Sequence, residues 1–104
     1  MKIKAVTDEY IEFTNGNKIT YDHDPDCCEE NYADFSQIEE SAFNQEFVQP
    51  LVFEMVEDKG FRFGNPRMYF IPCYSDQNGY YSTNLDIYYS GVCVFRTTCE
   101  ERFG

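Results

Sequence analysis

Glycine-containing turns separate runs of β-forming residues at three places in this chain, and no other feature constrains its fold as strongly. The stretches are FTNGN at 13–17, EDKGF at 57–61 and DQNGY at 76–80. Glycine readily adopts the left-handed backbone conformation that tight hairpin loops require. We therefore expect consecutive β-hairpins and a largely antiparallel sheet.

The alternation of apolar side chains predicts a register for each hairpin. A three-residue loop at 14–16 pairs Ile11 with Ile19, whereas a two-residue turn would split the apolar side chains between opposite faces. Pro72 has no N–H to donate, so its strand should lie at a sheet edge or carry a bulge. By the same parity, the other expected pairs are Met55 with Phe63, Ile71 with Leu85, Tyr69 with Ile87, Ile87 with Cys93, and Leu85 with Phe95.

One α-helix is predicted between the first two hairpins. Ser36 and Glu39 match a capping box, and the stretch 36–49 contains no glycine or proline before Pro50. Its apolar residues, Ile38, Ala42, Phe43 and Phe47, form a broad stripe. With 104 residues the chain has the size of one domain. We expect residues 1–104 to form a single α+β domain, a mostly antiparallel meander sheet built from β-hairpins with one α-helix packed on it.

The charge is strongly negative, with 19 acidic residues against 8 basic ones and a net charge of −11. Between Lys18 and Lys59 there are 12 acidic residues and no lysine or arginine. Such a surface repels phosphate groups, so nucleic acids and anionic membranes are not expected as partners. Basic proteins, metal cations and cationic ligands remain as partners.

The cysteine content suggests a compartment. The chain has five cysteines, an odd number, and its N-terminal residues lack the apolar segment of a signal peptide. We therefore expect a cytoplasmic protein with free thiols. Cys73 and Cys93 share the parity of the apolar positions and are predicted to be buried.

The stretch HDPDCCE at 23–29 contains the only histidine and is the first candidate site. His23, Cys27 and Cys28 are suitable zinc ligands. A neighbouring aspartate, Asp22, Asp24 or Asp26, could complete a tetrahedral site, and Asp26 is the candidate we select. The spacing opposes this interpretation, because adjacent cysteines in a strand point to opposite faces. Only a turn, which Pro25 would permit, lets both cysteines bind one ion.

Three other interpretations apply to the same stretch. Asp22, Asp24 and Asp26 match the start of a calcium-binding EF-hand loop, but its sixth and twelfth positions hold Cys27 and Ala33. A disulfide between two adjacent cysteines is strained. The favoured interpretation involves no cofactor: one cysteine packs inward, the carboxylates cap turns, and the histidine is hydrogen-bonded near acids.

A second candidate site is NGYYS at 78–82. Asn78 marks the turn, and Tyr80 and Tyr81 follow it, so a tyrosine ring can project as a flat contact surface. An equally acceptable interpretation makes both tyrosines ordinary strand residues. No set of residues forms a coherent catalytic centre, because the acids around His23 and the cysteines disfavour a reactive thiolate. An enzymatic activity is therefore not favoured.

HDPDCCE and NGYYS, with VEDKGFRFG at 56–64 as a weaker third element, resemble an uncharacterised family of small bacterial and phage proteins. The resemblance implies a cytosolic or phage-encoded single domain and assigns no catalytic residue. We expect a small, acidic, soluble, non-enzymatic module that binds a protein or associates with itself as a homo-oligomer. The alternatives are a zinc protein that uses His23, Cys27 and Cys28, and a phage-encoded inhibitor of a basic host protein.

Overall fold

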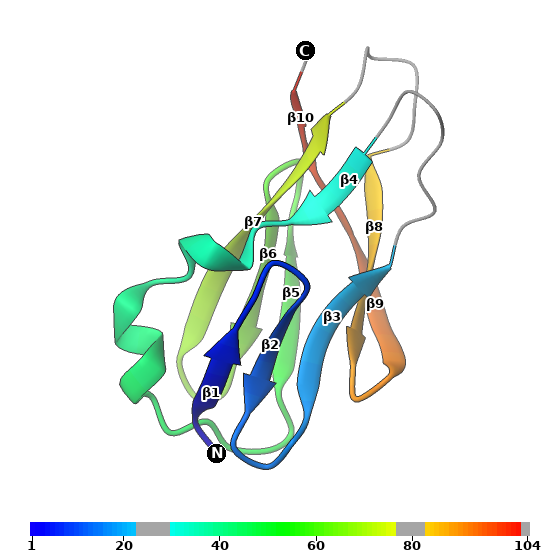
Figure 1. Cartoon of the computed structure of the whole chain (residues 1–104). Helices are drawn as coiled ribbons and strands as arrows, with labels where there is room; N and C mark the ends of the chain where they lie inside the picture. The colour runs from blue at the N-terminus through cyan, green and yellow to red at the C-terminus, as the bar shows by residue number, and fades with distance from the viewer. Residues whose placement is uncertain (23–29, 77–82, 103–104) are drawn as a thin grey trace.

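The computed structural model is a sandwich of two β-sheets, and it describes residues 1–22, 30–76 and 83–102 (Figure 1). The first sheet has the order β1-β2-β3-β8-β9, formed by β1 (Ile3–Val6), β2 (Tyr10–Phe13), β3 (Lys18–Asp22), β8 (Asn84–Tyr89) and β9 (Val92–Thr98). The second has the order β10-β7-β6-β5, with β4 also paired to β7; its strands are β4 (Glu30–Ala33), β5 (Val52–Val56), β6 (Gly60–Gly64), β7 (Met68–Asp76) and β10 (Glu100–Arg102). All pairs are antiparallel except β10 with β7, which is parallel.

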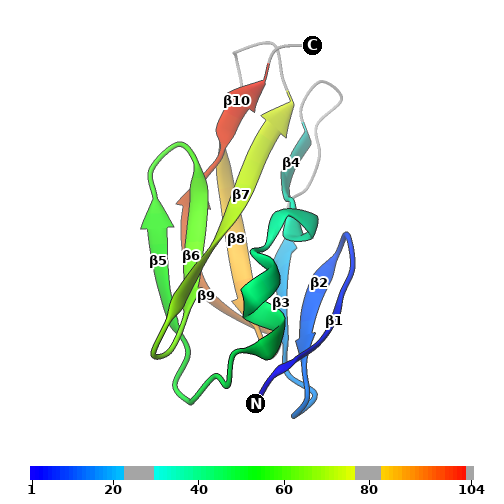
Figure 2. The ribbon, with the colours of Figure 1, turned by 90° about the vertical axis from the view of Figure 1, so that its left-hand side faces the viewer.

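The α+β prediction is wrong, because the described part of the chain contains no α-helix. Two short 3₁₀ helices, η1 (Phe35–Gln37) and η2 (Glu40–Asn44), occupy the segment where the α-helix was expected. Figure 2 shows them along the side of the sandwich, where η1 contacts β7 and η2 contacts β1. The chain leaves η2 in an extended conformation, which buries Phe47 and leaves Phe43 43% exposed. Tertiary packing of Phe47 against the core thus overrides the local helix preference.

The first hairpin forms as predicted. Ile11 pairs with Ile19, and the N–H of Phe13 donates to the carbonyl of Asn17, which leaves a three-residue loop at 14–16. Gly16 is left-handed, with φ of 89°. The turn residue and the apolar alternation are both local, and together they determined this register.

The second hairpin forms with a register two residues away from the prediction. Met55 pairs with Phe61, not Phe63, because the turn spans Val56–Lys59 and precedes Gly60. Asp58 takes the left-handed conformation at φ 59° in place of the glycine. A shift by two preserves the faces, so Phe61 and Phe63 still point into the core.

The predicted third hairpin is wrong, because β7 and β8 belong to different sheets. Ile71 pairs with Phe61 and Leu85 pairs with Thr97, and the predicted loop at 77–79 lies outside the described residues. Consecutive strands β7 and β8 therefore belong to different sheets and do not continue a meander. Pro72 pairs only with Gly60 of β6, because β4 and β10 begin to pair with β7 at Cys73 and Tyr74. At Pro72 the ladder is therefore one-sided, as a residue without an N–H requires.

The last hairpin turns tightly and then bulges. Ser90 and Gly91 are both left-handed, with φ of 54° and 79°, which is the geometry of a two-residue type I′ turn. Tyr88 therefore pairs with Cys93, and a bulge restores the pairing of Ile87 with Phe95. The predicted partners Ile87–Cys93 and Leu85–Phe95 are thus wrong, and Cys93 is exposed where burial was expected. The burial predicted for Cys73 is confirmed.

The core is a continuous layer of aromatic rings between the sheets. The ring of Phe47 lies 5.5 Å from that of Phe13 and 5.7 Å from that of Phe63, so it contacts both sheets. At the side where β9 faces β5, Phe95 lies 5.9 Å from Phe53 and 5.8 Å from Phe61. These contacts close the sandwich along that side.

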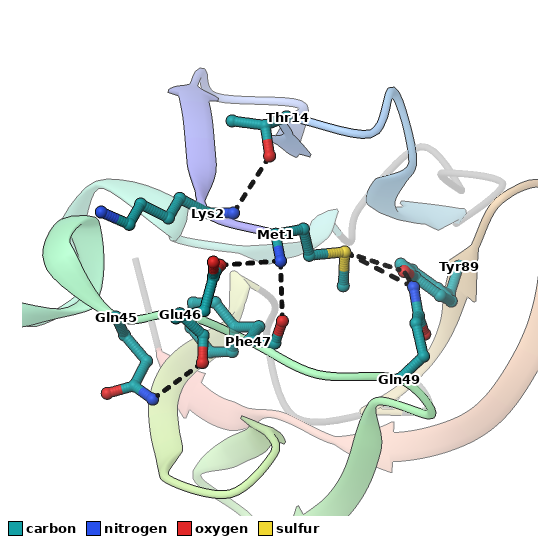
Figure 3. A network of polar contacts seen from close by, with 8 residues as sticks. All are labelled: Met1, Lys2, Thr14, Gln45, Glu46, Phe47, Gln49 and Tyr89. Carbon is teal, nitrogen blue, oxygen red and sulfur yellow. Dashed lines mark hydrogen bonds and ion pairs between the residues drawn. The ribbon is translucent and has the colours of Figure 1, made fainter.

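A polar network holds the chain around Phe47 at the lower end of the sandwich (Figure 3). The amino group of Met1 donates to the carbonyl of Phe47 at 2.8 Å and pairs with the carboxylate of Glu46 at 2.8 Å. Gln49 donates to the hydroxyl of Tyr89 at 2.7 Å. The network therefore connects β1, the segment after η2 and β8 where Phe47 enters the core.

Candidate functional site

Both sites predicted from the sequence lie outside the described residues. These are the zinc candidates His23, Asp26, Cys27 and Cys28, and the contact residues Asn78, Tyr80 and Tyr81. Both interpretations remain predictions. Within the described ranges, no group of three or more His, Cys, Asp or Glu side chains is placed to hold a metal ion.

The described residues do form an acidic cavity, of about 330 Å³. It lies between β3, β4 and the end of β7, and it also touches the β1–β2 loop. Its lining consists of four carboxylate residues, two tyrosines and an alanine: Asp8, Glu30, Asp34, Asp76, Tyr21, Tyr32 and Ala33. None of the described residues in the lining has a basic side chain, so these residues give the cavity a negative potential.

Strand pairing concentrates this charge. Glu30 lies directly opposite Asp76 in the β4–β7 ladder, and like charges in such a pair repel each other. Tyr32 lies opposite Tyr74, with the two rings 5.9 Å apart. The cavity thus combines several carboxylates with aromatic surface, a combination that suits a cation. Arg102 lies beside Asp76 in the β10–β7 ladder and offsets part of this charge.

The two tyrosines of the lining report on this environment. Burial raises the pKa of Tyr21 above 10.0, and the carboxylates of Glu9, Glu30 and Asp8 raise it further. Burial is also the largest cause that raises the pKa of Tyr32, followed by the charge of Asp76. Both phenols are therefore neutral at physiological pH and act as hydrogen-bonding groups, not as bases.

Asp34 is held in place by three hydrogen bonds. It accepts hydrogen bonds from the hydroxyl and the backbone N–H of Ser36 and, at 2.8 Å, from the side chain of Gln37. The Ser36 hydroxyl is the largest cause that lowers the pKa of Asp34 below 3.8. Asp34 therefore stays charged while it caps η1.

A cation already occupies the border of this region. The guanidinium of Arg102 lies 3.6 Å from the centre of the Tyr74 ring, and its charge opposes the rise in the pKa of Tyr32. This is the cation–π geometry that proteins use to hold guanidinium and ammonium groups. The acidic, aromatic surroundings thus accommodate a basic side chain.

The sequence indicated the excess of acids but not their convergence. Asp8, Tyr21 and Asp76 lie far apart along the chain and meet only because β3, β4 and β7 come together. The sequence of β4, Glu30–Ala33, shows no alternation of polar and apolar residues, and nothing local identifies β7 as its partner. No helix among the described residues is long and apolar enough to cross a membrane.

Comparisons with known proteins found no matching family model, no similar curated protein and no similar solved structure. The resemblance to small bacterial and phage proteins therefore stays a prediction.

Proposed function

We propose that the chain is a non-enzymatic cytoplasmic binding module for a basic protein, and that the acidic cavity receives a lysine or arginine side chain of that partner. The observation that carries this proposal is the pairing of Glu30 with Asp76 beside Tyr32, in a cavity whose described lining residues include no basic side chain. A cationic side chain would neutralise two repelling carboxylates and pack on aromatic surface. The alternative of a phage-encoded inhibitor of a basic host protein would use the same surface.

The test is a titration with short peptides that carry three lysines or three arginines, with a three-glutamate peptide as the negative control. The cavity variant combines Glu30→Gln with Asp76→Asn. The control variant combines Glu40→Gln with Glu57→Gln, which removes the same charge from exposed positions outside the cavity. Isothermal calorimetry at low salt measures the affinity, and the titration is repeated at higher salt.

We expect the cavity variant to lose about tenfold in affinity and the control variant about twofold or less, because only the first removes charges that contact the ligand. Circular dichroism of both variants checks that neither has lost its fold, because Asp76→Asn removes the repulsion from Glu30 and also the attraction of Arg102, which lies beside Asp76 in the β10–β7 ladder. Equal losses of affinity in both variants would show that binding depends on the net charge of the protein and not on the carboxylates of the cavity. Absence of binding to either basic peptide would contradict the proposal.

A second candidate function, self-association, rests on the strands at the edges of the two sheets. β5 and β9 end their sheets and carry exposed apolar side chains, with Val92 64% and Val52 49% exposed. Edge strands with exposed apolar residues favour pairing with another chain. Analytical ultracentrifugation of the parent and of a Val52→Lys, Val92→Lys variant tests this: a dimer that the variant abolishes supports it, and a monomeric parent contradicts it.

A further inference from the structure

Two of the described cysteines are buried together in the interior. Cys73 lies in β7 and Cys99 lies between β9 and β10, and both are almost fully shielded from solvent, with 0% and 1% exposure. The neighbouring thiol of Cys99 is the largest cause that raises the pKa of Cys73. The third described cysteine, Cys93, is exposed on the surface.

The parallel pairing of β10 with β7 explains this contact. Glu100 lies beside Tyr74, and the pairs continue in step through Arg102 and Asp76. One step back in the same register brings Cys99 beside Cys73. Neighbouring strands lie about 4.8 Å apart, which is within the Cα separation of disulfide-bonded cysteines, about 4.4–6.8 Å.

We propose that Cys73 and Cys99 are an oxidative modification site that forms an intramolecular disulfide with a small disulfide compound as the oxidant. The reaction is thiol–disulfide exchange in two steps. The thiolate of one cysteine attacks a sulfur of the oxidant, forms a mixed disulfide and releases one thiol. The second cysteine then attacks the protein sulfur of the mixed disulfide and releases the second thiol. Two protein thiols are oxidised and one disulfide compound is reduced to two thiols.

The order of the two steps follows from which thiol the oxidant can reach. Cys99 lines a cavity of about 310 Å³ together with Asp58, Glu100 and Glu101. Cys73 is not among the residues that line this cavity. Its thiol donates to the carbonyl of Ile71 at 3.9 Å. Contact with Cys99 and burial raise the pKa of Cys73, so its thiol stays protonated in the folded chain. Cys99 therefore reacts first, and the carboxylates around it favour a neutral oxidant over an anionic one.

A disulfide between Cys73 and Cys99 would restrain the chain where it crosses between the two sheets. Cys99 is the residue at which the chain passes from β9 in the first sheet to β10 in the second. A bond to Cys73 would fix this crossing to the middle of the second sheet. It would also close a loop from residue 73 to residue 99 and so restrict the unfolded chain.

The experiment uses a variant in which Cys73 and Cys99 are the only cysteines, made by Cys27→Ser, Cys28→Ser and Cys93→Ser. The folded protein is incubated near pH 8 with bis(2-hydroxyethyl) disulfide, which is neutral, and is also refolded from urea in its presence. Intact mass and peptide mapping identify the product. The matched control carries Cys73→Ser in addition, which keeps the cysteine that reacts first and removes the one that resolves the mixed disulfide.

We expect the variant to lose the mass of two hydrogen atoms, to yield a peptide linked through Cys73 and Cys99, and to unfold several degrees higher than its reduced form. The control should form only the mixed disulfide. The proposal is overturned if the variant refolds but stays reduced, or stops at the mixed disulfide, in both the native and the refolding reactions. A linked product with an unchanged or lower unfolding temperature would overturn the stabilising consequence.

Discussion

The hydroxyl of Thr97 donates a hydrogen bond to the backbone carbonyl of Gly60, and this buried bond joins the two sheets. Thr97 belongs to β9 of the first sheet and Gly60 to β6 of the second. On the surface beside it, the backbone N–H of Asp58 donates to the hydroxyl of Thr98 at 2.7 Å. Two adjacent threonines therefore connect the sheets, one inside the core and one outside.

Thr97→Val should lower the free energy of unfolding by about 1–3 kcal/mol, because it removes a buried donor while keeping the shape of the side chain. Thr98→Val should cost about 0.5 kcal/mol or less, since water can replace its exposed hydroxyl. Urea denaturation of both variants measures the difference. Equal effects at the two positions would show that the buried bond does not stabilise the sandwich.

Gly60→Ala should destabilise the fold by about 2–5 kcal/mol, from a steric clash and backbone strain together. An added Cβ would lie 2.2 Å from the carbonyl oxygen of Ile71, and φ is 145°. Gly91→Ala is the matched control, because Gly91 is also left-handed but has no atom within 4 Å of the added Cβ. We expect that control to cost about 1 kcal/mol. Thermal unfolding followed by circular dichroism compares them.

The stability that Asp34 contributes should depend on acidity. Its pKa in the folded chain is lowered, chiefly by the Ser36 hydroxyl, below the ordinary value of 3.8. This contribution is therefore present above pH 3.8 and is lost as the pH falls through the lower folded pKa. The stability difference between the parent and Asp34→Asn should shrink in acid. Ser36→Ala should move the pKa of Asp34 upward in an NMR titration, and an unchanged value would contradict the assigned cause.

Tyr21 should show the opposite dependence in alkali. Burial, followed by the charge of Glu9, raises its pKa above 10.0, so its contribution is complete below pH 10 and is lost as the pH rises through the folded pKa. The alkaline fall in stability should be smaller in Tyr21→Phe. Glu9→Gln should lower the pKa of Tyr21, measured by the ultraviolet absorbance of the phenolate against Tyr21→Phe as the blank.

Local signals were sufficient for the first hairpin but not for the second. Ile11, Ile19 and Gly16 belong to one short stretch, and the alternation of apolar residues leaves only one register. In the second hairpin, Asp58 takes the left-handed conformation that glycine was expected to take, and its N–H is bound by Thr98 of β9. A contact 40 residues away thus helps to place the turn.

The helix and the third hairpin failed for the same physical reason. The segment 36–49 has helical spacing, yet burial of Phe47 between Phe13 and Phe63 requires an extended exit from η2. The strands β7 and β8 alternate as hairpin strands do, yet each finds its partners in a different sheet. The acidic cavity also depends on these non-local pairings. The sequence shows that acidic residues are abundant, but it does not predict which of them lie close together in the folded chain.

The way the strands are shared between the sheets has a consequence for how the chain reaches its native state. The first sheet combines β1, β2 and β3 with β8 and β9, and the second combines β4 to β7 with β10. Severing the backbone between β7 and β8 would therefore yield two fragments that each lack strands of both layers. We expect neither fragment to acquire structure alone, and a mixture of the two to reconstitute the native sandwich. Synthesis must proceed almost to β10 before either layer is complete, and such distant pairings typically give folding times of about milliseconds to seconds.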